Sequence, residues 1–140
     1  MSYTNTFIYI AEDCPVETSV VPVSGRAKKT AYEIEYELLS KNPYKFTEED
    51  LLYEIHIRHK ELPEDYVSSH ADEIRAELFK KPHACLRASQ LPKKYGWGIH
   101  YDEQGRIAIY GMETEQYREF TQPGEGKPSL LPAMRSKRAK

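Results

Sequence analysis

The residue types best suited to chemistry gather in the segment 83–111. Cys85 is flanked there by His83 and Arg87, and nearby positive charge favours the reactive thiolate form of a cysteine. A Cys/His pair is the minimum for nucleophilic catalysis. Cys85 with His83 or His100 is therefore a candidate catalytic pair. The alternative is that Cys85 is a small buried apolar residue.

The same segment offers side chains for a ligand pocket. Trp97 lies between two glycines and follows Tyr95, so the two rings are candidates for pocket walls, with His100 as an acid or base. Arg87 stands in a small apolar run and needs acceptors if it is buried. It would bind a carboxylate or phosphate, or pair with Glu54 of a neighbouring strand. We expect Arg87, Tyr95, Trp97 and His100 to bind a ligand; the alternative is a core tryptophan in a tight turn.

The five histidines and two cysteines have no metal-binding spacing. There is no CxxC, HExxH or Cys2His2 pattern. His56 and His59 are three residues apart, which would bring them together on a helix. On the strand that we predict there, they face opposite sides. We therefore expect no metal site and no cofactor.

Charge is distributed in blocks although the net charge is only −2. Residues 26–46 carry five bases against three acids, and residues 47–79 carry three bases against ten acids. Residues 80–100 and 127–140 each carry five bases and no acid. The near-neutral total argues against a dedicated DNA-binding protein. The blocks either neutralise one another or converge into a surface for a small anionic ligand or an acidic protein.

Binding of RNA through the basic tail is a second alternative, but no RNP or KH signature accompanies that tail. The chain has 140 residues, no apolar run near the roughly 20 residues that span a bilayer, and no secretory signal. Its two cysteines are far apart and form no disulfide framework. We expect a soluble cytoplasmic protein with free thiols. The sequence indicates nothing about its oligomeric state.

Local patterns predict elements that would position these side chains. The predicted strands are 7–10, 52–59, 83–89 and a hairpin of 97–102 with 106–112. The predicted helices are 27–42, 64–81 with a weak point at "SSHAD", and 113–121, with helical turns at 47–51 and 90–95. Glu33, Glu35 and Glu37 are expected to be solvated.

These elements indicate an α+β domain over residues 1–121. We expect a mostly antiparallel sheet of four or five strands packed by two main helices, with a mixed sheet as the alternative. Residues 122–140 read as an extended, Pro/Gly-rich basic tail with little structure of its own.

Several motifs together resemble a known family. They are "TFIYIAEDCP", "PYKFTEEDLLYE", "CLRASQLPKKYGWGIHYDEQGRIAIYG" and the closing "AMRSKRA". The resemblance is to short bacterial and fungal proteins classed as a domain of unknown function. It implies one complete domain with the tail as part of the protein. It transfers no activity and no catalytic residues.

Overall fold

The strands form one mixed sheet with the order β3-β2-β1-β4. The computed structural model describes residues 3–136. Its strands are β1 (Thr6–Tyr9), β2 (Trp97–Tyr101), β3 (Ile107–Gly111) and β4 (Ser129–Pro132). β2 pairs antiparallel with β1 and β3, whereas β4 lies parallel to β1. The α+β class and the β2–β3 hairpin are confirmed, and the parallel pair makes the sheet mixed.

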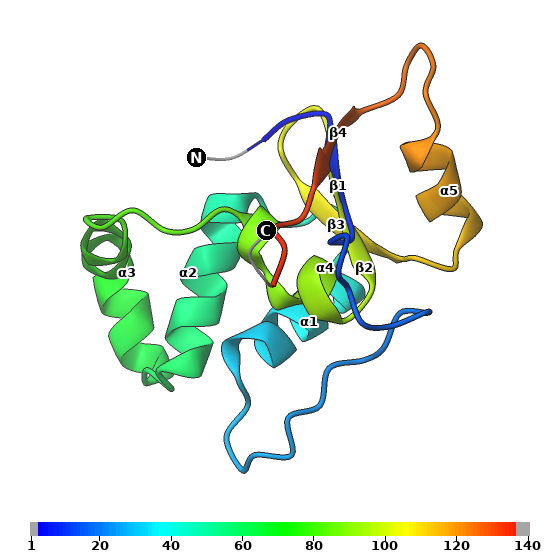
Figure 1. Cartoon of the computed structure of the whole chain (residues 1–140). Coiled ribbons are helices and arrows are strands. Elements are labelled where there is room, and N and C mark those ends of the chain that lie inside the picture. The colour runs from blue at the N-terminus through cyan, green and yellow to red at the C-terminus, as the bar shows by residue number, and fades with distance from the viewer. Residues whose placement is uncertain (1–2, 137–140) are drawn as a thin grey trace.

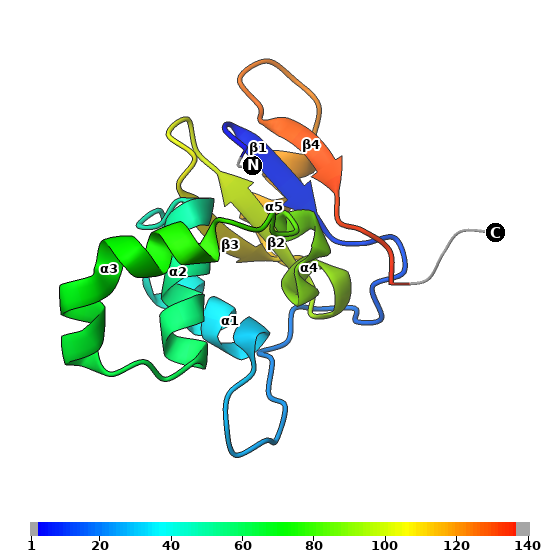
Figure 2. The same ribbon diagram turned by 90° about the vertical axis from the view of Figure 1, so that its left-hand side faces the viewer.

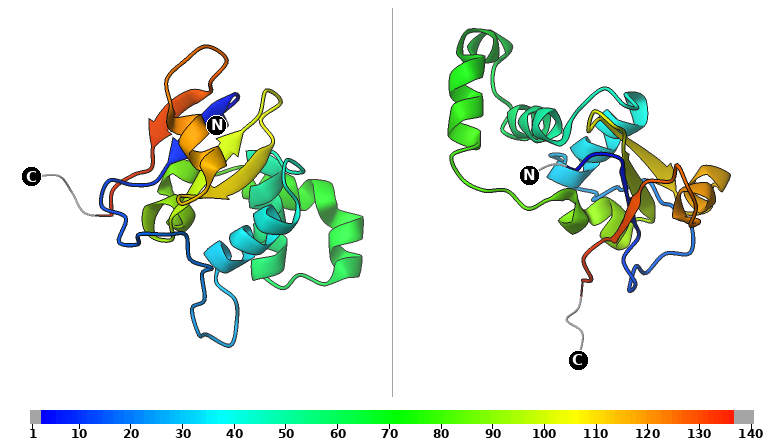
Figure 3. Two further views of the ribbon diagram at one scale, coloured as in Figure 1. Left: turned by 90° about the vertical axis from the view of Figure 1, so that its right-hand side faces the viewer. Right: turned by 90° about the horizontal axis from the view of Figure 1, so that it is seen from above.

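Helices cover both faces of this sheet. The described residues form α1 (Ala31–Lys41), α2 (Glu48–His59), α3 (Glu64–Leu78), α4 (Gln90–Lys94) and α5 (Glu115–Thr121). α1 and α4 contact the sheet on one face, α5 packs on the other, and α2 lies against α1. Figure 3 shows α3 standing apart from the sheet on the outer side of α2. The expectation of two main helices was therefore too simple.

Two capping boxes set the starts of α1 and α2. The Thr30 hydroxyl accepts from the Glu33 N–H, and the Glu33 carboxylate accepts from the Thr30 N–H; Thr47 and Asp50 repeat the pattern. α1 therefore begins four residues later than predicted. The second box begins a helix that runs to His59, so the predicted strand 52–59 is wrong. The two histidines three residues apart are on a helix after all.

The sheet separates two apolar regions. On the helical side, Ile8, Ile99 and Tyr101 join a buried core with residues of α1, α2 and α4. On the other side, Phe7 meets Tyr117 and Phe120 of α5 at ring-centroid distances of 5.2 and 5.0 Å. Successive residues of a strand point to opposite faces, so Phe7 and Ile8 belong to different regions.

The segment 83–89 is not the predicted strand. It contains a short 3-10 turn, η1 (Leu86–Ala88), followed by α4. The backbone carbonyl of Arg87 in this turn accepts from the Met134 N–H at 2.8 Å, and the Arg87 Nε–H donates to the Pro132 carbonyl at 2.7 Å. The turn therefore binds the C-terminal segment and is not a strand of the sheet.

The C-terminal segment is partly built into the sheet, as Figure 2 shows for β4 beside β1. The backbone N–H of Ser129 donates to the carbonyl of Asn5, just before β1, and that of Ala133 donates to the carbonyl of Tyr9 in β1. Positions 130 and 132 therefore turn their backbone groups outward. Pro132 has no N–H and its carbonyl is occupied by Arg87, which protects this edge from strand addition. The predicted tail of little structure is thus corrected for β4. The predicted boundary after residue 121 stays a prediction, and residues 137–140 lie outside the described part.

No helix among the described residues is long and apolar enough to cross a membrane.

Candidate functional site

Trp97 and His100 lie on opposite faces of β2. Trp97 packs beside the helical-side core, with its ring centroid 5.2 Å from that of Tyr36, and its Nε1–H donates to the Val20 carbonyl at 2.8 Å. His100 stacks on Phe120 of α5, on the other side of the sheet, at 4.3 Å. Trp97 and His100 therefore do not line one pocket together, and their predicted roles in ligand binding stay predictions.

His100 lies at the end of a chain of hydrogen bonds that contains two tyrosine hydroxyls. Its Nδ1 lies 2.7 Å from the Tyr44 hydroxyl, which lies 2.8 Å from the Tyr110 hydroxyl. Burial lowers the pKa of His100, and the charge of Asp102 opposes this only in part. Tyr44 has a positive φ of 59°, an uncommon backbone conformation for a residue of its size. The imidazole is thus oriented and favoured in its neutral form, which does not attract an anion.

Arg87 and Tyr95 are also engaged within the chain. Arg87 binds the backbone of the C-terminal segment, as described above, and not Glu54. Tyr95 stacks on Tyr32 of α1 at 5.5 Å, and a hydrogen bond with Tyr32 raises the pKa of Tyr95. Their predicted role in ligand binding stays a prediction, and their observed contacts connect parts of the fold.

Cys85 forms no hydrogen bond with a histidine among the described residues. Its Sγ accepts a hydrogen bond from the Tyr3 hydroxyl at 3.4 Å. The exposed His83 donates through Nε2 to the Leu78 carbonyl at 2.7 Å, and His100 is bound to Tyr44. The structure therefore does not assemble the predicted Cys/His pair.

Two buried carboxyl groups were not foreseen. Glu35 of α1 is only 7% exposed, and it accepts a hydrogen bond from the Ser89 hydroxyl. Burial raises the pKa of Glu35 to about 7, and the nearby charge of Glu48 adds to the effect. Burial also raises the pKa of Glu48, although a hydrogen bond donated by Tyr101 opposes the shift. The expectation that Glu35 is solvated is wrong.

The position of Glu35 on α1 carried a signal that sequence reasoning missed. Glu35 lies four residues after Ala31 and four before Leu39, so it falls on the apolar stripe that faces the core. Glu33 and Glu37, two residues to either side, lie off this stripe and remain accessible.

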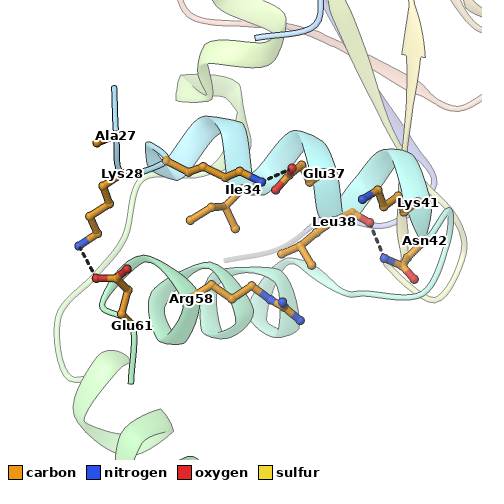
Figure 4. A pocket seen from close by; sticks show the side chains of 10 residues that line it. Ala27, Lys28, Ile34, Glu37, Leu38, Lys41, Asn42, Arg58 and Glu61 are labelled. Atoms are coloured by element: carbon orange, nitrogen blue, oxygen red, sulfur yellow. Dashed lines mark hydrogen bonds and ion pairs between the residues drawn. The ribbon is translucent and has the colours of Figure 1, made fainter. Parts of the chain in front are cut away.

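A cleft of about 500 Å³ lies between α1 and α2 (Figure 4). Such a volume lies within the range of small-molecule sites. Cations outnumber acids along its walls. The lining residues are Ala27, Lys28, Lys29, Ile34, Glu37, Leu38, Lys41, Asn42, Arg58 and Glu61. The sequence hinted at this cleft through the basic block 26–46, but nothing in the pattern showed that α2 would supply Arg58 opposite it.

The positive charge of the cleft is paired at one end and available at the other. Lys28 lies 4.0 Å from the Glu61 carboxylate, and Lys29 is paired with Glu37. Arg58 uses one nitrogen, Nη2, to donate to Glu54 at 3.2 Å. Lys41 forms no ion pair within residues 3–136. Lys41 and the unused donors of Arg58 therefore remain for an anion.

A sequence model of one family, described as "Family of unknown function (DUF6157)", matches residues 1–139. The chain belongs to this family. The membership confirms the family resemblance inferred from the sequence. No curated protein and no solved structure matches the chain.

Two motifs within the longest stretch that carried the resemblance, "CLRAS" and "YGWGIH", have structural roles in this member of the family. In "CLRAS", Leu86 enters the core, Arg87 binds the C-terminal segment and Ser89 bonds to Glu35. In "YGWGIH", a Cβ at Gly98 would lie 2.4 Å from the ring of Phe7. The motifs thus describe packing around η1 and β2, and they do not mark a shared pocket.

A second cavity, of about 590 Å³, lies between α2 and α3 and includes His56 and His83. Burial lowers the pKa of His56, and the neighbouring charges of Lys60 and His83 lower it further. No group of three or more possible metal ligands occurs among the described residues. The basic tail is partly engaged as well, because Arg135 lies 3.3 Å from Glu12.

Proposed function

We propose that this protein binds a small anionic ligand in the cleft between α1 and α2. The observation that supports the proposal is the charge of the cleft lining, which contains four cationic side chains and two carboxylates. This retains the ligand class expected from the charge blocks. The site moves from the surroundings of Trp97 to the opposed faces of α1 and α2.

Lys41 and Arg58 are the residues best suited to hold the anionic group. Lys41 comes from the last turn of α1, Arg58 comes from α2, and both line the same end of the cleft (Figure 4). An arginine presents five donors in a planar fork that matches a carboxylate or phosphate, and only one nitrogen of Arg58 is engaged with Glu54. Lys41 adds a charge that no carboxylate in residues 3–136 neutralises.

Calorimetric titration with phosphate-bearing metabolites, together with amide chemical-shift mapping, tests the proposal. We expect shifts centred on Lys41, Asn42 and Arg58. Lys41→Met and Arg58→Met should each weaken binding about tenfold or more, because each removes a charge-assisted contact. Lys94→Met is the matched control, since Lys94 is an exposed lysine outside the cleft. Binding that both cleft variants retain at full strength, or no binding by wild type, contradicts the proposal.

The two free thiols bear on the cellular compartment of the protein. Cys14 and Cys85 are free and half-buried. Unpaired cysteines persist in reducing surroundings, so we propose that the protein resides in the cytoplasm. Localisation of a C-terminally tagged chain in cells would test this directly.

A further inference from the structure

We infer that the anion bound in the cleft carries hydroxyl groups, as a sugar phosphate or a sugar acid does. This inference rests on the proposed function. The proposed function concerns the charged group of the ligand, and the inference concerns the rest of the ligand molecule.

The walls away from Lys41 present donors and acceptors together. Lys28 with Glu61, and Lys29 with Glu37, form two ammonium–carboxylate pairs that line the cleft. Glu61 follows α2 in a left-handed conformation, with a φ of 54°, and Figure 4 shows its carboxylate directed to Lys28 across the cleft. A hydroxyl group donates one hydrogen bond and accepts others, so it can bond to both members of such a pair.

The apolar residues of the cleft offer little surface to a hydrocarbon ligand. Ile34 and Leu38 project between the two helices, but each is only 7% exposed. The remaining apolar lining residue is the small Ala27. An alkyl chain in the cleft would remove water from the two ion pairs without replacing its hydrogen bonds, which costs free energy. A hydroxylated body replaces those bonds.

Calorimetry with five probes separates the ligand's charged group from its body. Inorganic phosphate supplies the charge alone, ribose the hydroxyls alone, and butyl phosphate the charge with an alkyl body. Ribose 5-phosphate and gluconate combine charge with hydroxyls and distinguish a phosphate from a carboxylate group. We expect ribose 5-phosphate or gluconate to bind at least tenfold more tightly than inorganic phosphate and butyl phosphate.

Glu61→Gln tests the role of the acceptors. Removing the carboxylate raises the positive potential of the cleft and so favours any anion. The informative quantity is therefore the ratio of the affinity for the better hydroxylated anion to that for inorganic phosphate. We expect this ratio to fall at least threefold in Glu61→Gln. It should stay unchanged in Glu64→Gln, which removes an equal charge outside the cleft.

Equal affinities for ribose 5-phosphate, butyl phosphate and inorganic phosphate, all weakened by Lys41→Met, would overturn the inference and leave the proposed function intact. Tighter binding of butyl phosphate would do the same. Absence of binding by every anionic probe would remove the proposed function itself.

Discussion

The Ser89 hydroxyl donates a hydrogen bond to the Glu35 carboxylate across 54 residues of chain, at 2.5 Å. This bond joins α1 to the segment that precedes α4. Among residues 3–136, no lysine or arginine forms an ion pair with Glu35. The charge of Glu48, which has the same sign, acts on Glu35 and raises its pKa. Within residues 3–136 the fold therefore holds a buried acid that is hydrogen-bonded to a neutral hydroxyl and forms no ion pair with a cation.

The first prediction concerns stability against pH. The pKa of Glu35 is about 7 in the folded chain against an ordinary value of 4.5, so between these values the unfolded chain has released a proton that the folded chain keeps. Stability therefore falls as pH rises through this window, by a total on the order of 3 kcal/mol, and then levels off.

Glu35→Gln removes this titration and retains an acceptor for Ser89. We expect the variant to lose less stability than wild type between pH 5 and pH 8, measured by urea unfolding at each pH. Because the other titrating groups are common to both proteins, the difference between the two curves reports the titration of Glu35 together with its coupling to Glu48. Parallel curves would show that Glu35 does not titrate in this window.

The second prediction concerns Gly98, where β2 passes under α5. A Cβ there would lie 2.4 Å from Phe7 Cζ and 2.7 Å from Tyr117 Cε2. Gly98→Ala should therefore destabilise the fold by about 1–3 kcal/mol through overpacking, as read from denaturant midpoints. Phe7→Leu removes the atom in closest contact, so the double variant should lose less than the sum of the single losses. Strict additivity would rule out this steric cause.

The third prediction concerns the attachment of the C-terminal segment. Arg87→Met removes the donor to the Pro132 carbonyl, but the backbone bond from Met134 to residue 87 remains. The local stability of residues 129–134 should fall by about 0.5–1.5 kcal/mol, seen as faster amide hydrogen exchange there. Arg106→Met, at an exposed arginine in the β2–β3 turn, is the matched control. Exchange that is equal in both variants would argue against the contact.

The fourth prediction concerns His100. Burial disfavours its charged form, so its pKa in the folded chain should lie below the ordinary value of 6.5. A histidine that is buried neutral contributes stability above the unfolded pKa, and this contribution is lost as pH falls. Imidazole proton shifts followed by NMR against pH give the folded value, and the urea-unfolded chain gives the reference. A folded midpoint at or above the reference would contradict the burial argument.

Elements set by local patterns were predictable from the sequence. Helix α1 follows from its apolar spacing and its stop before Pro43, and the β2–β3 hairpin follows from two β-rich runs around Gly105. Gly105 has a φ of 79°, as such a turn requires. In each case the decisive contacts lie close together in the chain.

Helix α2 shows how a local pattern misleads. Tyr53, Ile55 and Ile57 alternate with polar residues, which is typical of a strand. However, α2 packs against α1 and α3, so apolar residues are useful on more than one of its faces. The capping box at Thr47 and Asp50 was the better guide, because this motif marks the first turn of a helix.

The site was harder to predict because it depends on distant segments. Trp97 and His100 are an odd number of residues apart, and this spacing alone places them on opposite faces of a strand. By contrast, nothing local in the sequence brings Arg58 opposite Lys41, or β4 beside β1. Those arrangements depend on packing over long separations in the chain.

The parallel pairing of β1 with β4 has a consequence for synthesis of the chain. β1 is synthesised before both of its neighbours in the sheet, β2 and β4, and all five helices of residues 3–136 are made between β1 and β4. Phe7 and Ile8 are fully buried in the folded protein, but their side chains stay exposed to solvent until the neighbouring strands have been synthesised. Nascent chains of this protein should therefore depend on chaperones until β4 has been synthesised.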